Sequence, residues 1–561
     1  MKYRKPFYNS FLALAALSAF SNQTNYAEEP DDRPNILWIT CEDISPNLGC
    51  YGDTVSKTPF LDKLASEGIR YTNAFSCAGV CAPSRSSIIT GMYQTSIGTH
   101  NMRTGEDVFG ISKGVYNKNI GLIDPEGNTV PEYSTVIPPF VKCFTEYLRM
   151  NGYYCTNNSK TDYQFAPPIT AWDECSDKAH WRNRPKGKPF FVVFNFLITH
   201  ESRIWMKKND PLLINLNSPS LPPYFPEDSV VRQDVARDYS NIAELDKLVA
   251  DLVQQLKDDG LLENTIIFFF SDHGGPLPRG KREIYDSGIH TPLIIRFPNG
   301  KYAGTVCNDL VSYVDLAPTV LSLADIKPLK YMQGQPFLGK YKAKGARKYI
   351  FAARDRMDAK YDRVRIVRNH DFLYVKNFRP DLPNYQDIIY RKQMDMMNEL
   401  LLLHKEGKLN EVQEIWFRDH KPVEELYLVN EDPFQIHNIA EDPEYASQLK
   451  VMRKALDNWL KDVGDQGSVP EGELIRKNWP NLEQPQTAMP EIKVTDNEAM
   501  ISCSTDGASI AWQITPKGMK SSPEWKNWHV YSEPVRLQKN EVLHAVAIRI
   551  GYKQSEESKT D

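Results

Sequence analysis

The sequence predicts an α/β protein in which a large mixed, mostly parallel sheet is sandwiched by helices, followed by a smaller α+β part and a terminal β-sandwich. Two observations predict the large sheet. Continuous apolar runs, such as residues 33–40 and 265–270, are typical of strands buried on both faces, as in parallel sheets. Segments with apolar residues at helical spacing, the longest at residues 235–259, alternate with these runs in the order of βα units.

The elements follow in order along the first part of the chain. Residues 33–40 (RPNILWIT) form a strand, and residues 58–75 contain a helix for which Gly68 is the expected stop. Residues 136–158 repeat this form as a helix, an Asn-Gly stop and a strand. Residues 188–202 contain a strand that ends in polar residues. Residues 235–274 contain the long helix and then a second such strand, and residues 313–326 contain one more helix. Open α/β sheets place their active sites just past the carboxyl ends of such strands.

Changes in composition divide the chain into five parts. After about residue 340 the regular alternation gives way to short alternating strands and one helix. A Pro- and Asn-rich stretch follows, and the last part holds only short strands. The predicted parts are a signal peptide (1–27), a large N-terminal subdomain (33–340), a smaller α+β subdomain (341–465), a linker (466–486) and a small β-sandwich (487–561).

The first residues are typical of an export signal. The positive segment MKYRK precedes the apolar run FLALAALSAF (11–20). This run is too short for a bilayer core, which needs about 20 residues, so we expect a cleaved signal peptide, no membrane span, and export to the periplasm or the extracellular medium. A net charge of −5 gives no indication of nucleic-acid binding. Nine cysteines in 561 residues are too few for a disulfide framework.

Metal-binding residue types follow two of the predicted strands. Glu42 and Asp43 come directly after one strand, and Asp272 and His273 come after another far along the chain. If these groups meet at one sheet edge, they could hold a divalent cation that prefers oxygen ligands, Ca²⁺ or Mg²⁺. Either pair alone would more simply cap a following helix. The two pairs together favour a metal site.

Four side chains that carry or can carry positive charge lie just past a strand or at the start of a helix. They are Arg85, Lys160, His200 and Lys281. Beside a metal ion they would form an anion pocket and stabilise charge that develops on a transferred sulfuryl or phosphoryl group. Taken singly, each lysine is typical of a solvated surface charge, and His200 of a loop histidine.

Cys81 lies in the segment GVCAPSRSSIITG (79–91) and allows several readings. As a thiol nucleophile it would need a base close by. As half of a disulfide it has a possible partner in Cys77, provided that the geometry allows the bond. Neither reading explains the positions of Pro83 and Arg85.

The same segment resembles the signature of type I sulfatases, Cys-x-Pro-Ser-Arg followed by an apolar pair and Thr-Gly. In that family the cysteine is oxidised by a formylglycine-generating maturation enzyme to Cα-formylglycine, an aldehyde that acts as its hydrate. The resemblance extends over residues 33–465 and implies an alkaline-phosphatase-like fold. It also implies that Cys81 is the precursor of the nucleophile and that Arg85 stabilises its ionised form.

The remaining candidates match the family in order. The resemblance makes Asp272 and His273 metal ligands together with Glu42 and Asp43, although the family usually has Asp in place of Glu42. It implies that Lys160 and Lys281 neutralise sulfate oxygens, and that His200, with Lys281, protonates the leaving atom. Asp162 stands where most members have histidine, so the resemblance does not say which residue makes that histidine's contact to the leaving group.

The subgroup that the sequence resembles contains heparan N-sulfatase and sugar 6-O-sulfatase enzymes, which implies a sulfated, glycosaminoglycan-type carbohydrate as substrate. The C-terminal part resembles the small Ig-like domain of chitobiase and hexosaminidase enzymes. The second subdomain could supply an anion clamp, or its arginines could form an ordinary salt-bridge cluster. The candidate substrate-binding residues are His100, Arg103, Asp162, Arg354, Asp355 and Arg356.

Two other functions remain compatible with the sequence. One is a phosphodiesterase or phosphonate monoester hydrolase of the same superfamily, since some of those enzymes also use formylglycine. The other is a non-catalytic glycan-binding relative that keeps the scaffold. The presence of Cys81, Arg85, Lys160, His200 and Lys281 together argues against the second function.

Overall fold

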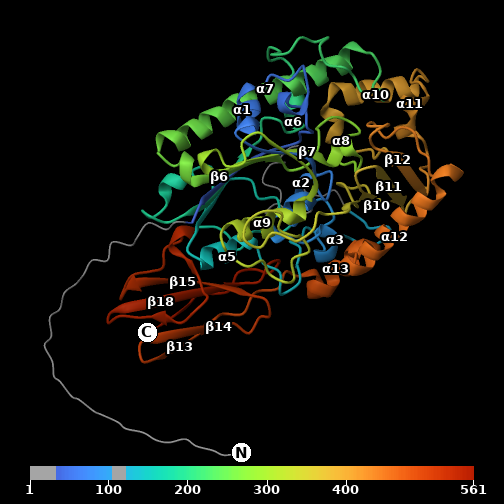
Figure 1. The fold of residues 1–561 in the computed structure, drawn as a ribbon. Helices are drawn as coiled ribbons and strands as arrows, with labels where there is room; N and C mark the ends of the chain where they lie inside the picture. Colours follow the sequence, from blue (N-terminus) through green and yellow to red (C-terminus); the bar gives the residue numbers. More distant parts are fainter. Residues whose placement is uncertain (1–32, 104–121, 561) are drawn as a thin grey trace, which may run out of the picture.

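The computed structural model describes residues 33–103 and 122–560 (Figure 1), so the predicted signal peptide lies outside the described residues. Within these residues, eight strands form one sheet in the order β4-β3-β5-β1-β6-β7-β2-β8. Neighbours are parallel except at β7, which runs antiparallel to β6 and β2. The large mixed, mostly parallel sheet is therefore confirmed. Its strands are β1 (Asn35–Cys41), β2 (Gly68–Phe75), β3 (Tyr154–Asn158), β4 (Glu174–Cys175), β5 (Phe190–Phe196), β6 (Thr265–Ser271), β7 (His290–Arg296) and β8 (Thr305–Ser312).

Helices cover both faces of the sheet, as Figure 1 shows. Ile36 and Trp38 of β1 point into one core, while Leu37 and Ile39 point into the other, because successive side chains of a strand alternate between faces. This double burial explains the continuous apolar runs in the sequence. The first core contains α2 (Cys81–Thr90), α5 (Phe144–Met150) and α9 (Leu316–Leu323), and the second contains α1 (Pro59–Ser66) and α7 (Ser229–Asp258).

Gly68 has a different function from the helix stop that was expected. Helix α1 ends at Ser66, and Gly68 is the first residue of β2. A Cβ atom on Gly68 would lie 2.3 Å from the carbonyl oxygen of Ile295 in β7, which is closer than side-chain atoms can approach. Glycine is needed here because two strands come together, not because the helix needs a left-handed residue.

The second subdomain is a four-stranded antiparallel sheet in the order β12-β11-β10-β9. One face packs under α12 (Ala446–Val463), through Met452 and Leu456. The other face packs against the large subdomain, where Ile350 and Ile366 share a core with Phe75 and Ile289. The strands are β9 (Ile350–Arg354), β10 (Val364–Arg368), β11 (Phe372–Asn377) and β12 (Glu424–Leu428).

The connection between β11 and β12 returns to the large subdomain. Its helix α10 (Asp395–Lys405) packs on α7, and Met396 and Leu400 share a core with Val231 and Val235. The backbone N–H of Met396 donates to Asp234 Oδ2 (2.8 Å), which anchors the start of α10. The short helices near these elements are α3 (Gln94–Ile97), α6 (Ser202–Met206), α8 (Asp286–Ile289) and α11 (Glu411–Glu414).

The last part of the chain forms a small β-sandwich with its own core, which contains Ile501 and Leu543. Lys142 anchors it to the large subdomain, since its Nζ donates to Gly507 O (2.7 Å) and Ser509 Oγ (2.9 Å). One sheet has the order β13-β14-β17 and the other β16-β15-β18-β19. The strands are β13 (Glu491–Thr495), β14 (Glu498–Ser502), β15 (Ser509–Pro516), β16 (His529–Val530), β17 (Val535–Arg536), β18 (Glu541–Ile548) and β19 (Ser558–Lys559).

The predicted linker, residues 466–486, is folded against the rest of the molecule and contains α13 (Glu471–Asn478). The buried carboxylate of Glu471 accepts hydrogen bonds from Arg356 Nε (2.6 Å) and Nη2 (2.8 Å). The hydroxyls of Tyr133 (2.8 Å) and Tyr361 (2.7 Å) also donate to it. A Pro- and Asn-rich composition suggested a loose connection, but these four bonds tie the segment to both subdomains.

Two further features concern the whole described chain. No helix among residues 33–103 and 122–560 is long and apolar enough to cross a membrane. All nine cysteines lie in these ranges, and all nine are free thiols. The disulfide between Cys77 and Cys81, one of the alternatives from the sequence, is therefore not formed.

We expect Glu471→Ala to lower the free energy of unfolding by about 3–5 kcal/mol, because it leaves the buried Arg356 guanidinium without its counter-charge. The matched control is Asp381→Ala, which breaks the exposed pair between Arg379 and Asp381 and should leave the free energy of unfolding nearly unchanged. Urea unfolding followed by intrinsic fluorescence measures both. Equal losses for the two variants would show that Glu471 is not the anchor.

Candidate active site

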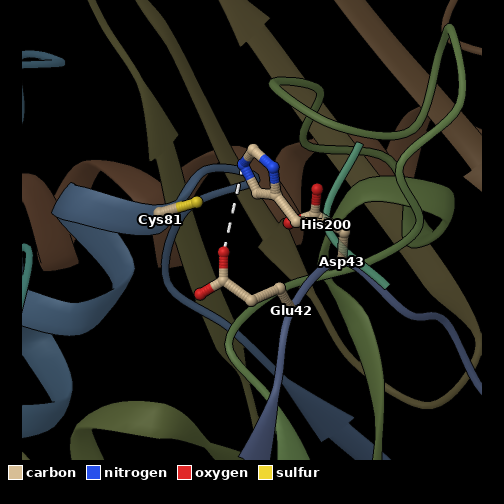
Figure 2. A group of neighbouring side chains, drawn as sticks. All are labelled: Glu42, Asp43, Cys81 and His200. Carbon is tan, nitrogen blue, oxygen red and sulfur yellow. Dashed lines mark ion pairs between the residues drawn. The ribbon is translucent and has the colours of Figure 1, made fainter. Parts of the chain in front are cut away.

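The polar residues that follow β1 and β6 meet at the carboxyl edge of the sheet, because these strands are parallel neighbours in register up to the pair Cys41 and Ser271. Glu42, Asp43, Asp272 and His273 are all at most 1% exposed. Figure 2 shows Glu42, Asp43 and His200 gathered beside the Cys81 side chain, which comes from the start of α2. The structure thus brings the two predicted pairs together.

The donor set fits a divalent cation. One potential ligand atom from each of Asp43, Cys81, Asp272 and His273 lies within 4.8 Å of all the others, and Glu42, Asp43, Cys81 and His200 form a second such group. Asp43 Oδ1 lies 3.1 Å from His273 Nε2, but no hydrogen-bond donor of the described residues is aligned with this buried oxygen. A buried carboxylate oxygen without a hydrogen bond is stabilised by positive charge, which the His273 imidazolium or, once His273 has lost its proton, a metal ion can supply.

The ionisation of these groups is compatible with metal binding. Burial alone would raise the pKa of both Asp43 and Asp272. Lys281 and His273 lower the pKa of Asp43 below its ordinary value. His273 and Arg85 lower the pKa of Asp272 in the same way. Burial would lower the pKa of His273, but Asp272 and Asp43 raise it to about 10. The imidazole therefore carries a proton next to the two carboxylates and must release it before Nε2 can ligate a metal.

Arg85 connects both acidic pairs. Its Nε donates to Asp272 Oδ2 (3.0 Å) and its Nη2 to Glu42 Oε1 (2.7 Å). The third donor, Nη1, binds Asn195 Oδ1 (2.9 Å). Only a planar guanidinium can reach three acceptors in this geometry, so Arg85 fixes the orientation of the acids.

The two lysines bind the same acids from other sides. Lys160 Nζ donates to Glu42 Oε2 (2.6 Å) and lies 3.6 Å from Asp162 Oδ2. Lys281 Nζ donates to Asp43 Oδ2 (2.6 Å). Burial would lower the pKa of Lys281, but Asp43 raises it well above its ordinary value, so the lysine stays protonated.

His200 lies near the oxygen of Glu42 that does not bind Arg85. Its Nε2 is 3.9 Å from Glu42 Oε2, as Figure 2 shows, and its Nδ1 is 2.8 Å from Ser202 Oγ. Burial and the charge of Lys281 lower the pKa of His200 well below its usual value. The ring is therefore neutral until an anion enters the site.

Cys81 is the first residue of α2 and is completely buried. Its Sγ lies 3.4 Å from His273 Nε2, between the two acidic pairs. Pro83 lies in the first turn of the helix, where a missing N–H costs nothing. Gly79 allows the close approach of another segment, because a Cβ there would lie 1.9 Å from Glu283 O. The signature therefore builds a helix start that directs residue 81 into the site.

Two site residues, Asn195 and Glu201, were not found from the sequence. Asn195 bridges the site, since its Oδ1 accepts from Arg85 and its Nδ2 donates to Asn157 Oδ1 (2.9 Å). Its signal is a single amide within the apolar run FFVVFNF. Glu201 accepts two hydrogen bonds from Arg282 (2.8 and 2.7 Å). Burial would raise the pKa of Glu201, but Arg282 and Lys281 lower it to about 2.

Of the candidate substrate-binding residues, Arg103 and Asp162 lie at the site. Arg103 forms an ion pair with Asp162, in which Nε donates to Oδ1 (2.8 Å), and Asp162 in turn lies beside Lys160. His100 is buried, and its Nδ1 has no hydrogen-bond partner among the described residues. Asp162, which replaces the expected histidine, thus holds an arginine next to Lys160.

The other three candidates lie inside the second subdomain. Arg354 forms buried ion pairs with Glu283 and Asp362. Asp355 binds Arg365 (2.9 Å), and Arg356 binds Glu471. Both Arg354 and Arg356 are 1% exposed. The anion clamp is therefore replaced by the alternative, an internal salt-bridge cluster, because protein carboxylates already occupy these guanidinium groups.

Comparison with known proteins gives consistent results. A family model described as Sulfatase matches residues 34–326, and a model described as the C-terminal part of N-sulphoglucosamine sulphohydrolase matches residues 279–398. An ulvan-active sulfatase of Formosa agariphila is 46% identical over 93% of this chain and 90% of its own length. Human N-sulphoglucosamine sulphohydrolase is 25% identical over 80% of this chain and 94% of its own length.

A solved structure in complex with its substrate, D-glucosamine-2-N,6-O-disulfate, has the same fold. It superposes with a TM-score of 0.53 and 19% identity, covering 78% of this chain and 99% of its own.

We expect Arg85→Lys to weaken Ca²⁺ or Mg²⁺ binding by about 10- to 100-fold, because a lysine cannot orient Asp272 and Glu42 at the same time. Isothermal titration of the metal-free protein measures the affinity. The control is Arg149→Lys, since Arg149 is a buried arginine that binds Asp173 (3.0 Å) and Trp528 O (2.6 Å) away from the site. Unchanged metal affinity in Arg85→Lys would contradict this role.

Proposed function

The chain belongs to the sulfatase family, and we propose that it removes sulfate from a carbohydrate of the ulvan or glycosaminoglycan type through a formylglycine made from Cys81. The observation that carries this proposal is the position of Cys81, which is buried between two acidic pairs and faces a set of protonated cations. The 46% identity to an ulvan-active sulfatase supports the substrate class. The match to a family model of N-sulphoglucosamine sulphohydrolase supports including N-sulfated sugars in this substrate class.

The Cys81 thiol is 0% exposed in the folded chain, so we propose that the maturation enzyme acts before folding is complete. Residues 79–91 carry the recognition signature and become α2 afterwards. The hydrate of the aldehyde would supply one hydroxyl to attack sulfur and a second hydroxyl whose deprotonation expels sulfate.

Glu42, Asp43, Asp272 and His273 would hold the metal ion, for which Ca²⁺ fits the carboxylate-rich donor set and Mg²⁺ is the alternative. Such an ion supplies positive charge for the ionised nucleophile and for the sulfate oxygens. Arg85 keeps the acids in place through its bonds to Asp272 and Glu42.

The chain's own cations prepare the site for an anion. Lys160 and Lys281 remain protonated next to Glu42 and Asp43, and both can turn toward sulfate oxygens. His200 lies at the edge of this group, where it can protonate the oxygen or nitrogen that leaves. A bound sulfate favours its protonated form and so opposes the lowering of its pKa by burial and Lys281.

We further propose that residues 1–27 direct export to the periplasm or the extracellular medium, where large sulfated polysaccharides are accessible. This rests on the charge and apolar pattern of the first residues.

We expect the mature protein to release sulfate from at least one defined sulfated mono- or disaccharide, and Cys81→Ala to release none. Ion chromatography of sulfate measures turnover, and peptide mass spectrometry of residue 81 reports the modification. Circular dichroism checks that the variant is folded. Preferred turnover of phosphate or phosphonate esters would instead favour a phosphodiesterase or phosphonate hydrolase. Full sulfate release by Cys81→Ala would overturn the mechanism.

We expect His200→Ala to reduce kcat by about 100- to 10,000-fold on a sugar sulfate, whose alkoxide needs a proton to leave. The effect on an aryl sulfate should be much smaller, because a phenolate leaves without full protonation. On the sugar, wild-type kcat should fall as pH rises through the pKa of His200 in the complex, and the variant should lack this fall. His180→Ala, at a half-buried histidine that accepts from Arg182 N (3.1 Å), is the control. Equal losses on both substrates would exclude this role.

A further inference from the structure

The connection between β11 and β12 brings an aromatic side chain of the second subdomain to the active site. The connection is held on the large subdomain by α10, whose Met396 and Met397 pack against Ile204 and Val235. Tyr390 precedes this helix by a few residues. Its position is therefore set by a packed core rather than by a free loop.

Tyr390 packs beside the start of α2. It lies against an apolar cluster that includes Val80, Ala82 and Met102. Val80 and Ala82 are the two neighbours of Cys81 in the chain. The cluster on which Tyr390 packs therefore includes the residues that flank residue 81.

Tyr390 also forms one side of an aromatic wall with Trp205 of α6. The two rings meet edge to face, with centroids 5.1 Å apart and planes at 77°. The centroid of Tyr390 is 6.4 Å from that of His200. Both Tyr390 and Trp205 are partly exposed, so part of each ring faces solvent.

The charges around the Tyr390 hydroxyl place it among the site residues. Burial raises the pKa of this hydroxyl, Glu201 adds to the rise, and Lys281, Arg282 and Arg103 oppose it. These groups come from both sides of the site. The tyrosine is therefore within electrostatic range of Lys281, Glu201 and Arg103.

Two large apolar side chains that adjoin the wall residues in the chain are exposed. Ile389 is 62% exposed and Met206 is 63% exposed, and each is the chain neighbour of one of the two aromatic residues. Large apolar side chains at this exposure next to a concave polar site are typical of a surface that a ligand covers.

We propose that Tyr390 and Trp205 form the wall against which the sugar ring that carries the sulfate packs, with Ile389 and Met206 extending it toward the next ring. This rests on the proposed function. The sulfur must reach residue 81, and the bridging oxygen must reach His200. The ring carbon bonded to that oxygen then lies next to His200, where the Tyr390 ring stands.

The chemistry of a pyranose ring suits such a wall. Its C–H groups form an apolar face that packs on aromatic rings, while its hydroxyls project from the edge toward polar partners. The Tyr390 hydroxyl offers one such partner. The wall accepts a ring of this shape and sets which ring position reaches residue 81, so it takes part in selecting the sulfate position.

The test compares two ways of occupying the site. A sulfated disaccharide or oligosaccharide that the wild-type enzyme hydrolyses has both a sulfate and a sugar ring. Inorganic sulfate, used as a competitive inhibitor, has no ring. We expect Tyr390→Ala and Trp205→Ala to raise KM for the sugar by about 10- to 100-fold, the range for losing the burial of one aromatic face. The inhibition constant of inorganic sulfate should stay within about twofold.

The chain offers a matched control in Tyr385→Ala. Tyr385 is half-buried on the same connection and meets Trp416 edge to face at 5.2 Å and 74°. It should leave KM for the sugar unchanged. Tyr390→Phe, which keeps the ring, should recover most of the affinity lost in Tyr390→Ala.

Three outcomes would overturn the inference. One is an unchanged KM in Tyr390→Ala and Trp205→Ala, and another is an equal rise in KM in Tyr385→Ala. The third is a parallel rise in the inhibition constant of inorganic sulfate, which would mean that the variants disturb the sulfate pocket itself. If the wild type releases no sulfate from any carbohydrate, the proposed function fails and this inference fails with it. If the wild type hydrolyses the sugar and the variants have an unchanged KM, only this inference is overturned.

Discussion

The structure of the site depends on the compensation of buried negative charge at one edge of the sheet. Glu42, Asp43 and Asp272 are almost completely removed from water, a state that is costly unless each carboxylate has positive partners. Arg85, Lys160 and Lys281 supply these partners from three separate segments. The buried acids need the charge of the cations, and the buried cations need the charge of the acids. Precise placement of a nucleophile and an anion pocket follows from this mutual requirement.

The sheet makes this compensation possible. Its strands are apolar on both faces, so their polar residues appear only past the carboxyl ends, where β1 and β6 run side by side. Asn195 at the end of β5 extends the same edge and receives Arg85. The rigid sheet holds the acids, whereas the cations arrive on helix α2 and on loops. The site is therefore assembled from rigid and adjustable parts.

The second subdomain and the segment after it support the site from outside. Arg354 and Arg356 use their charge to join segments, and Glu471 ties residues 471–478 to Arg356. Arg356 Nη1 also binds Met102 O (2.5 Å), next to Arg103, which pairs with Asp162 beside Lys160. A continuous set of contacts thus runs from α13 to the edge of the anion pocket. The connection that carries Tyr390 reaches the same pocket beside His200.

The sequence by itself determined the fold class, the acidic pairs, the cations and the signature around Cys81, because periodicity and contiguous motifs are local properties. Only the tertiary structure decided which cation meets which acid, and that Arg354 and Arg356 are internal. It also decided that residues 466–486 are folded, and that Tyr390 returns to the site. Most of these facts depend on contacts between residues far apart in the chain, such as Arg356 with Glu471. The path of the chain sets such contacts, and no local pattern of residues encodes that path.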